Sequence, residues 1–217
     1  MRSPRWLGVH SALQRLNLEP ENIPEGGDQG RIHVRRGRGD TEIEQRSHPA
    51  IGNAARHDPG KMAEIGLDRS STVVALGGGV VGDVSGFAAS TYMRGISLVQ
   101  VPTTLLAQVD SAIGGKTAID LAVAKNMVGT FYQPRMVVSD VETLETLGPK
   151  EFRNSFAEVI KYGVIWDPEL FKLLERKADW FFSSLGRKPF GAREFSFLET
   201  IVWRSALVKA KIVEQDE

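Results

Sequence analysis

The sequence predicts an α/β fold in which a parallel sheet and a glycine-rich turn precede an all-helical segment. A short β-branched run at residues 72–76 leads into three glycines and then into small residues typical of a packed helix start. A second apolar run at 97–101 completes a strand, helix, strand unit. Beyond residue 148, apolar residues recur at helical spacing.

The glycine-rich turn is the first candidate for function. Gly77, Gly79 and Gly82 match the pattern G-x-G-x-x-G between a predicted strand and a predicted helix. Glycine allows a sharp turn and lets main-chain amides approach a phosphate at a helix N-terminus. The pattern therefore predicts a phosphate or dinucleotide site. A turn that only packs the strand against the helix is the alternative.

The helix after this turn is expected to extend to about Tyr92, with Gly95 in the left-handed position that ends it. The strand at 97–101 is stopped by Pro102, and the two strands should be parallel with a right-handed crossover. An ordinary dinucleotide fold carries an acidic residue after its second strand, but here Thr103 and Thr104 follow the proline. This departure argues against a standard dehydrogenase half.

A second glycine loop contains Gly115, Lys116 and Thr117. It is not a P-loop, because Asp110 stands where that motif needs glycine and no strand leads directly into it. Together with Lys125 and the neighbouring Asn126, Lys116 suits an anionic ligand. Solvated surface lysines are the alternative.

The remaining elements follow from short-range signals. A buried strand is predicted at 136–140, and helices at 151–162, 167–185 and 192–217. Gly163 should end the first helix, and Asp167 with Pro168 should begin the second as N-cap and first residue. The resulting division is 1–65 unassigned, 66–148 α/β and 149–217 helical.

Glu158 and Lys161 lie three residues apart, on one face of the first of these helices. A surface ion pair is one interpretation. A carboxylate metal ligand beside an active-site amine is the other.

Composition narrows the class of protein. The 217 residues hold 27 basic and 27 acidic side chains and no cysteine, which argues against nucleic-acid capture, disulfides and thiolate metal sites. We expect a soluble, cytoplasmic protein, since the sequence shows no secretory signal or apolar run of about 18 residues. Residues 1–65 are expected to be poorly ordered, with the basic tract 31–39 a solvated loop. The four histidines there, at positions 10, 33, 48 and 57, fit no metal motif.

From about residue 66 onward, the chain resembles 3-dehydroquinate synthase, a member of the sugar-phosphate cyclase family. The motifs that carry the resemblance are ALGGGVVGDVSGFAAS, YMRG, QVPTTLLAQVDSAIGGKTAID, KNMVGTFYQP and FAEVIKYG, in the family's order and spacing. The resemblance implies a partial Rossmann-like, parallel-sheet NAD-binding half followed by the first helices of an all-α domain.

The resemblance also implies roles for individual residues. Glu158 resembles the carboxylate ligand of a catalytic divalent metal, zinc or cobalt. The substrate-facing residues it implies are Arg94, Asp110, Lys116, Asn126, Lys161 and Lys209, with Arg94 extending to a neighbouring subunit of a homodimer. The NAD contacts it implies are Gly79, Val80, Val81, Gly82, Asp83, Thr103, Thr104, Lys116, Lys125, Thr143, Leu144, Glu145 and Thr146.

The implied reaction converts 3-deoxy-D-arabino-heptulosonate 7-phosphate to 3-dehydroquinate with loss of phosphate, a step of the shikimate pathway. NAD takes a hydride and later returns it, and the metal polarises a hydroxyl. The lysines and the arginine suit a phosphorylated keto acid because they pair with phosphate, carboxylate and developing oxyanions.

The chain departs from the family in three places. Residues 1–65 do not match its earlier α/β structure, residues 119–124 replace its usual loop, and no histidine follows His57 to join Glu158 on a metal. We therefore expect a fragment, incomplete at both ends, with 3-dehydroquinate synthase identity but without activity as this chain. A related cyclase of secondary metabolism, or a non-catalytic NAD- or partner-binding fragment, remain the alternatives.

Overall fold

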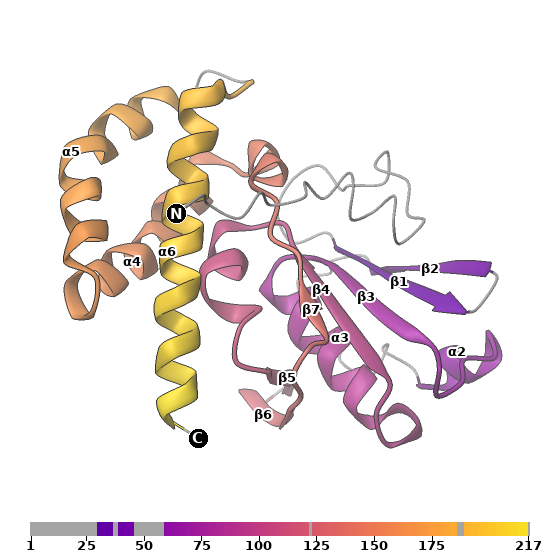
Figure 1. Cartoon of the computed structure of the whole chain (residues 1–217). Helices are drawn as coiled ribbons and strands as arrows, with labels where there is room; N and C mark the ends of the chain where they lie inside the picture. The colour runs from indigo at the N-terminus through magenta and orange to yellow at the C-terminus, as the bar shows by residue number, and fades with distance from the viewer. Residues whose placement is uncertain (1–29, 37–38, 46–58, 122, 186–188, 217) are drawn as a thin grey trace.

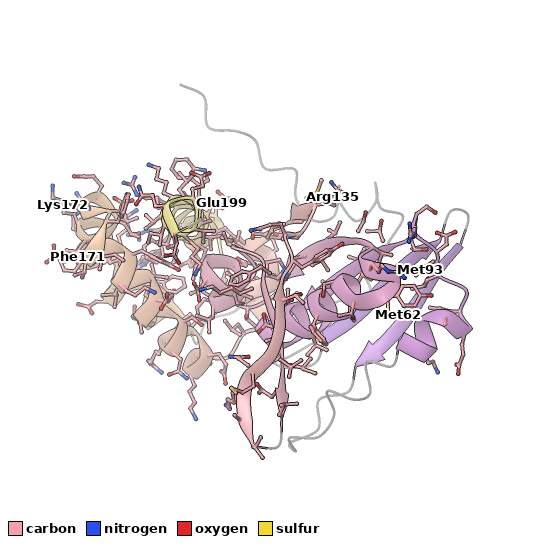
Figure 2. All side chains as sticks on the ribbon, turned by 90° about the horizontal axis from the view of Figure 1, so that it is seen from below. Met62, Met93, Arg135, Phe171, Lys172 and Glu199 are labelled. Atoms are coloured by element: carbon pink, nitrogen blue, oxygen red, sulfur yellow. The ribbon has the colours of Figure 1, made fainter. Side chains whose placement is uncertain are left out.

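The computed structural model describes residues 30–36, 39–45, 59–121, 123–185 and 189–216. An α/β half lies beside a helical half (Figure 1). In Figure 2, Phe171, Lys172 and Glu199 of the helical half lie at the opposite end of the molecule from Met62 and Met93. Among the described helices, none combines the length and apolar character needed to cross a membrane.

The α/β half is built on a five-stranded sheet of order β2-β1-β3-β4-β7. Strands β3 (Thr72–Gly77), β4 (Ser97–Pro102) and β7 (Met136–Val137) are parallel. The predicted strand, helix, strand unit is confirmed, with α3 (Gly79–Thr91) as its helix, whereas the third predicted strand is shorter than expected. Val74, Leu76, Val99 and Val101 are buried on β3 and β4, as a covered parallel sheet requires.

Two antiparallel strands, β1 (Gly30–Arg36) and β2 (Gly39–Gln45), extend the sheet beyond β3. The basic tract 31–39, expected to be a solvated loop, lies largely in β1, so that expectation is wrong, and α2 (Pro59–Glu64) follows the two strands. The expectation of poor order over 1–65 as a whole stays a prediction. In the sequence, the basic residues of β1 are followed by acidic residues in β2. The register sets Arg31 opposite Glu44, and Arg35 opposite Asp40. Of the histidines, only His33 lies within the described residues.

The end of α3 differs from the prediction. The turn η3 (Tyr92–Arg94) follows it, and Met93 (φ 49°) and Arg94 (φ 69°) take the left-handed conformation there. Gly95 has φ 118° and ψ 122°, so it is not the left-handed helix cap. A Cβ on Gly95 would lie 3.1 Å from the hydroxyl of Tyr132, which donates a hydrogen bond to Ile96 O at 2.7 Å. Both its φ and this close approach favour glycine.

A β-hairpin replaces the loop expected around Lys116. Strands β5 (Lys116–Leu121) and β6 (Ala124–Phe131) form a separate two-stranded sheet that packs on α3. Thr117 anchors it, because its hydroxyl lies 2.9 Å from Thr130 O and its methyl group fills the space beside Gly86. Any side chain at Gly86 would displace the hairpin.

The helical half consists of α4 (Pro149–Ile165), α5 (Pro168–Ser184) and α6 (Ala192–Asp216). Phe181 is at the centre of its core, with ring centroids 5.7 Å from Phe152, 5.7 Å from Phe156 and 5.0 Å from Phe197. The predicted stop at Gly163 is wrong, since α4 continues through it. A Cβ there would lie 3.1 Å from the backbone of Phe171, so the glycine permits close helix packing.

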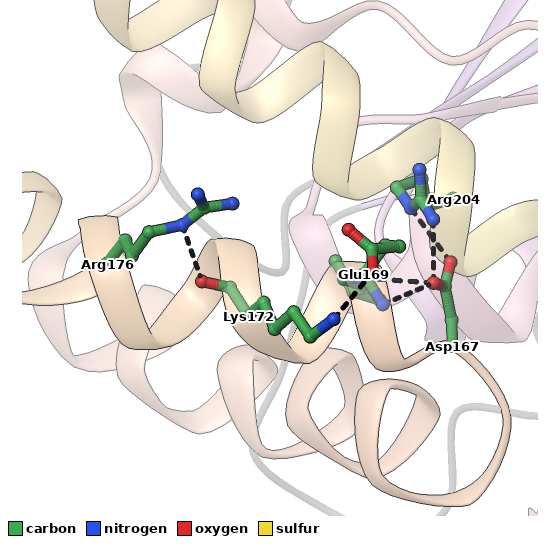
Figure 3. Close-up of polar contacts among 6 residues, drawn as sticks. Asp167, Glu169, Lys172, Arg176 and Arg204 are labelled. Atoms are coloured by element: carbon green, nitrogen blue, oxygen red, sulfur yellow. Dashed lines mark hydrogen bonds and ion pairs between the residues drawn. The ribbon is translucent and has the colours of Figure 1, made fainter.

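Asp167 is the predicted N-cap of α5 and is confirmed in that role. Its Oδ1 accepts hydrogen bonds from the amides of Glu169 and Leu170. Arg204 of α6 also donates two hydrogen bonds to this carboxylate, from Nε to Oδ2 at 2.8 Å and from Nη2 to Oδ1 at 2.7 Å (Figure 3). One carboxylate thus starts α5 and ties it to α6. The Arg204 hydrogen bond is the main cause of the lowered pKa of Asp167.

Replacing Asp167 with Ala should lower the free energy of unfolding by about 2–3 kcal/mol, because it removes a helix cap and a bidentate ion pair. Since the folded-state pKa is lowered, this stabilisation is present above the ordinary value of 3.8 and is lost as pH falls through the folded pKa. Urea unfolding at neutral and acid pH measures both effects. Lys172→Ala is the control, because its pair with Glu169 is exposed and should contribute about 0.5 kcal/mol or less.

Candidate active site

The glycine turn is pressed against the segment that follows β4. A Cβ on Gly78 would lie 3.1 Å from the Thr104 methyl group, and one on Gly79 would lie 2.9 Å from Ser111 Oγ. The Thr103 amide donates to Gly77 O at 2.9 Å. Among the described residues no side chain caps the N-terminus of α3. Its first amides therefore remain to bind an anion such as a pyrophosphate.

The side chains of the turn have different surroundings. Val80 is 59% exposed, whereas Val81 is buried in the core. A Cβ on Gly82 would collide with the side-chain oxygen of Gln100 on β4. The turn can therefore offer its backbone and Val80 to a ligand, while Val81 and Gly82 fix α3 on the sheet.

Asp110 lies beside this turn, in the short π-helical segment η4 (Ala107–Ser111). Its Oδ1 accepts a hydrogen bond from the hydroxyl of Tyr162 at 2.9 Å and lies 2.9 Å from Lys209 Nζ. These partners come from α4 and α6, so Asp110 is where the α/β half meets the helical half. A π-helical turn of this kind is frequent at functional sites.

Tyr162 connects this carboxylate to the other predicted residues of α4. It is 1% exposed, and the Lys161 ammonium lies 4.9 Å from its ring centroid. Lys161 also forms an ion pair with Glu158, so the predicted i,i+3 pair is present. Burial, followed by the negative charge of Asp110, raises the pKa of Tyr162, which keeps the phenol protonated as a donor.

A groove of about 370 Å³ runs along the hairpin beside α3. It is lined by Asp83, Lys116 and Asn126, together with six uncharged residues of the hairpin. Asn126 takes a left-handed conformation (φ 55°), and its amide donates to Asp120 Oδ1 at 2.9 Å. Asp120, from the unusual stretch, thus holds the backbone of Asn126. Lys125, next to it, is exposed.

The third group of predicted cofactor contacts lies in η5 (Val141–Thr146). The side chains of Thr143 and Leu144 are buried, so they are covered by protein. Glu145 Oε1 accepts the amide of Phe190 at 2.6 Å, and Thr146 is exposed. Of these four residues, Thr146 is therefore the most accessible to a ligand.

The fold brings seven of the predicted residues together in two groups. Asp110, Lys161, Lys209 and Glu158 meet around Tyr162, and Asp83, Lys116 and Asn126 share the groove. Arg94 lies apart from the glycine turn, because it precedes β4 while the turn pairs with the other end of that strand. Six residues of strand separate the two by roughly 20 Å.

Two residues of the site escaped the sequence analysis. Tyr162 follows Lys161 within the motif FAEVIKYG and reads as an ordinary core residue, and Gln108 lies inside QVPTTLLAQVDSAIGGKTAID. A polar residue in the middle of a buried segment was the available signal for Gln108. For Tyr162 no local signal distinguishes a hydrogen-bonded phenol from core packing.

The described residues do not by themselves make a metal centre. They contain no group of three His, Cys, Asp or Glu side chains placed to hold an ion. The carboxylate of Glu158 is paired with Lys161. A catalytic zinc ion normally has about three protein ligands, so Glu158 alone is not enough to hold one.

Asp83 should make stability depend on pH. Burial, then the charges of Asp120 and Asp110, raise its pKa from 3.8 to about 6. The folded state keeps a proton that the unfolded chain releases, so stability falls as pH rises between these values. Asp83→Asn should therefore melt higher than the wild type at about pH 7.5, and the difference should shrink toward about pH 4. Thermal melts at both pH values measure this, and an equal difference at both would contradict it.

The family models and the curated relatives that match this chain all carry the same family name. The family model described as 3-dehydroquinate synthase N-terminal matches residues 53–154, and the one described as 3-dehydroquinate synthase C-terminal matches 155–217. The 3-dehydroquinate synthase of Pelotomaculum thermopropionicum is 55% identical over 171 residues, which are 78% of this chain and 43% of that protein. The enzyme of Pelobacter propionicus is 55% identical over 157 residues, covering 72% of this chain and 41% of its own length.

Solved structures with a similar fold are sugar-phosphate cyclases. The 2-epi-5-epi-valiolone synthase ValA of Streptomyces hygroscopicus, with NAD+ and Zn2+ bound, has a TM-score of 0.69 at 28% identity, covering 79% of this chain and 47% of that one. A 2-deoxy-scyllo-inosose synthase complexed with carbaglucose-6-phosphate, NAD+ and Co2+ has a TM-score of 0.61 at 28% identity, covering 76% and 42%. These confirm the predicted partial Rossmann-like half followed by helices.

The chain spans 43% and 41% of the lengths of the two curated relatives described. The two family models adjoin and together extend from residue 53 to residue 217, which includes the glycine turn, Asp110 and the helical half. The predicted resemblance is therefore confirmed, and the chain belongs to the 3-dehydroquinate synthase family.

Proposed function

We propose that this chain carries the cofactor-binding turn and part of the active site of a 3-dehydroquinate synthase, an NAD- and metal-dependent phosphate lyase and cyclase. Its substrate would be 3-deoxy-D-arabino-heptulosonate 7-phosphate and its products 3-dehydroquinate and phosphate. The observation that carries the proposal is the cluster of Asp110, Lys161 and Lys209 beside an uncapped glycine turn. A shikimate-pathway role implies a cytoplasmic location.

The glycine turn fits NAD. Gly78 and Gly79 leave the backbone open at the start of α3, and Thr104 and Ser111 border it. Bound NAD supplies a hydride acceptor that later returns the hydride. The protein's part is to hold the pyrophosphate on the α3 amides and to place the dinucleotide beside Asp110.

The polar cluster fits a phosphorylated keto acid. Lys161 and Lys209 are cations that can pair with the phosphate and carboxylate groups, and Lys116 and Asn126 line the adjoining groove. Asp110 is held by two donors, so its carboxylate is oriented and can hold or pass a proton at a fixed point. Among the described residues no metal site is complete, so these are roles that the side chains can perform by themselves.

Two alternatives deserve tests of their own. The solved neighbours make valiolone and inosose skeletons by name, so a related cyclase of secondary metabolism would share this turn and cluster. A non-catalytic chain that binds NAD or pairs with another subunit would keep the turn without the reaction.

Assembly as a homodimer, with Arg94 reaching a partner's site, is part of the main proposal.

NAD binding tests the cofactor turn. The purified chain should bind NAD in isothermal calorimetry, and Gly79→Ala should weaken binding by about tenfold or more, because a Cβ enters the space beside Ser111 where the α3 amides meet the phosphates. Gly191→Ala is the control, a glycine at the start of α6 whose Cβ would meet only the flexible Glu194 side chain. Equal affinity of both variants would contradict the assignment of the turn.

Substrate binding tests the cluster. With NAD present, Lys209→Met should weaken binding of 3-deoxy-D-arabino-heptulosonate 7-phosphate by about tenfold or more, since a charge-assisted contact is lost. Lys172→Met on α5, whose ion pair is exposed, should leave the affinity unchanged. Tighter binding of another phosphorylated sugar would favour the related cyclase, and NAD binding without any sugar phosphate would favour the non-catalytic chain.

A further inference from the structure

Gln108 is a buried polar residue that the proposed chemistry does not use. It lies in η4 and is 0% exposed. Its Nε2 is within hydrogen-bond distance of three acceptors: Pro102 O at 3.0 Å, Asp140 O at 2.7 Å and Thr143 Oγ1 at 3.2 Å. Two of these acceptors lie 32 and 35 residues away in the sequence. One amide group therefore joins the end of β4 to the start of η5.

The two segments that Gln108 joins are opposite parts of the proposed NAD site. Pro102 directly precedes Thr103, whose amide binds Gly77 O in the glycine turn. The main-chain N–H of Gln108 donates a hydrogen bond to Thr104 O at 3.0 Å. On the other side, Asp140 and Thr143 begin η5, which carries the exposed Thr146. The position of η5 relative to the turn thus depends on this side chain.

The orientation of the Gln108 side chain is fixed by its partners. Pro102 O and Asp140 O are carbonyl oxygens, so the amide nitrogen must face them. This leaves Oε1 buried without a hydrogen-bond partner among the described residues. An unsatisfied buried acceptor costs free energy that an apolar side chain would avoid. A polar group kept at such a cost calls for a reason other than core packing.

We propose that Gln108 is a positioning residue that sets the separation between the glycine turn and η5 and thereby the affinity for NAD. This inference rests on the proposed NAD site. Gln108 acts through Pro102, Asp140 and Thr143, and it does not itself contact the dinucleotide.

The test compares NAD affinity with stability. Gln108→Met keeps the length of the side chain but removes its donors, and it should raise the Kd for NAD by about tenfold. Leu174→Ala is the matched control, a core truncation on α5 in the helical half. It should lower the melting temperature at least as much while leaving the Kd unchanged. Calorimetry is run well below both melting temperatures, with circular dichroism confirming the fold.

A second variant separates positioning from general loss of structure. Gln108→Glu has nearly the same shape, but its carboxylate would face two carbonyl oxygens and cannot donate. Burial should raise the pKa of the new carboxyl, so on acidification it should gain a proton and donate again. The ratio of variant to wild-type Kd should therefore fall toward one between about pH 8 and pH 5 for Gln108→Glu, and stay constant for Gln108→Met.

The possible outcomes separate the positioning role of Gln108 from the proposed NAD site on which it rests. If the wild-type chain binds NAD and Gln108→Met binds it equally well, or if Leu174→Ala loses the same affinity, the positioning role is wrong while the NAD site stands. If the wild-type chain binds no NAD, both the site and the role of Gln108 are wrong. Weakened binding in Gln108→Met with acid recovery in Gln108→Glu would establish the role.

Discussion

The close approach of α3 to its neighbours is the constraint on which the rest of the structure depends. Gly82 and Gly86 leave no room for a side chain against Gln100 and Thr117, and Gly79 leaves none against Ser111. Because α3 lies so near β4, η4 and the hairpin, its N-terminal amides open beside Asp110. The glycine motif therefore serves packing, and the phosphate binding that we propose for it is compatible with that role.

The electrostatics of the site follow from that packing. Asp83, Asp110 and Asp120 lie close enough for the latter two to raise the pKa of the first. Lys209 and the Tyr162 hydroxyl bring compensating groups to Asp110 from the helical half. Asp110, at the junction of the two halves, is thus paired. Asp83, on α3, has a pKa raised to about 6. Perturbed carboxyl pKa values such as that of Asp83 are common at functional sites.

The described residues provide a framework for the proposed NAD site but do not complete a metal site. The glycine turn, the segment after β4 and η5 form a continuous framework around the proposed NAD site, linked through Gln108. Glu158, by contrast, has Lys161 as its partner within the described residues. The chain spans 43% of the Pelotomaculum relative, and its match to the family extends over residues 53–217.

The sequence by itself determined the β3–α3–β4 unit, the three helices and the Asp167 cap, because strand periodicity, glycine turns and N-caps depend on neighbours a few residues away. Only the tertiary structure decided the hairpin at Lys116, the strands β1 and β2, the passage of α4 through Gly163 and the roles of Tyr162 and Gln108. These depend on contacts between distant segments, such as Tyr162 with Asp110, 52 residues apart. Local propensity carries no information about which distant group will satisfy a buried hydroxyl or amide.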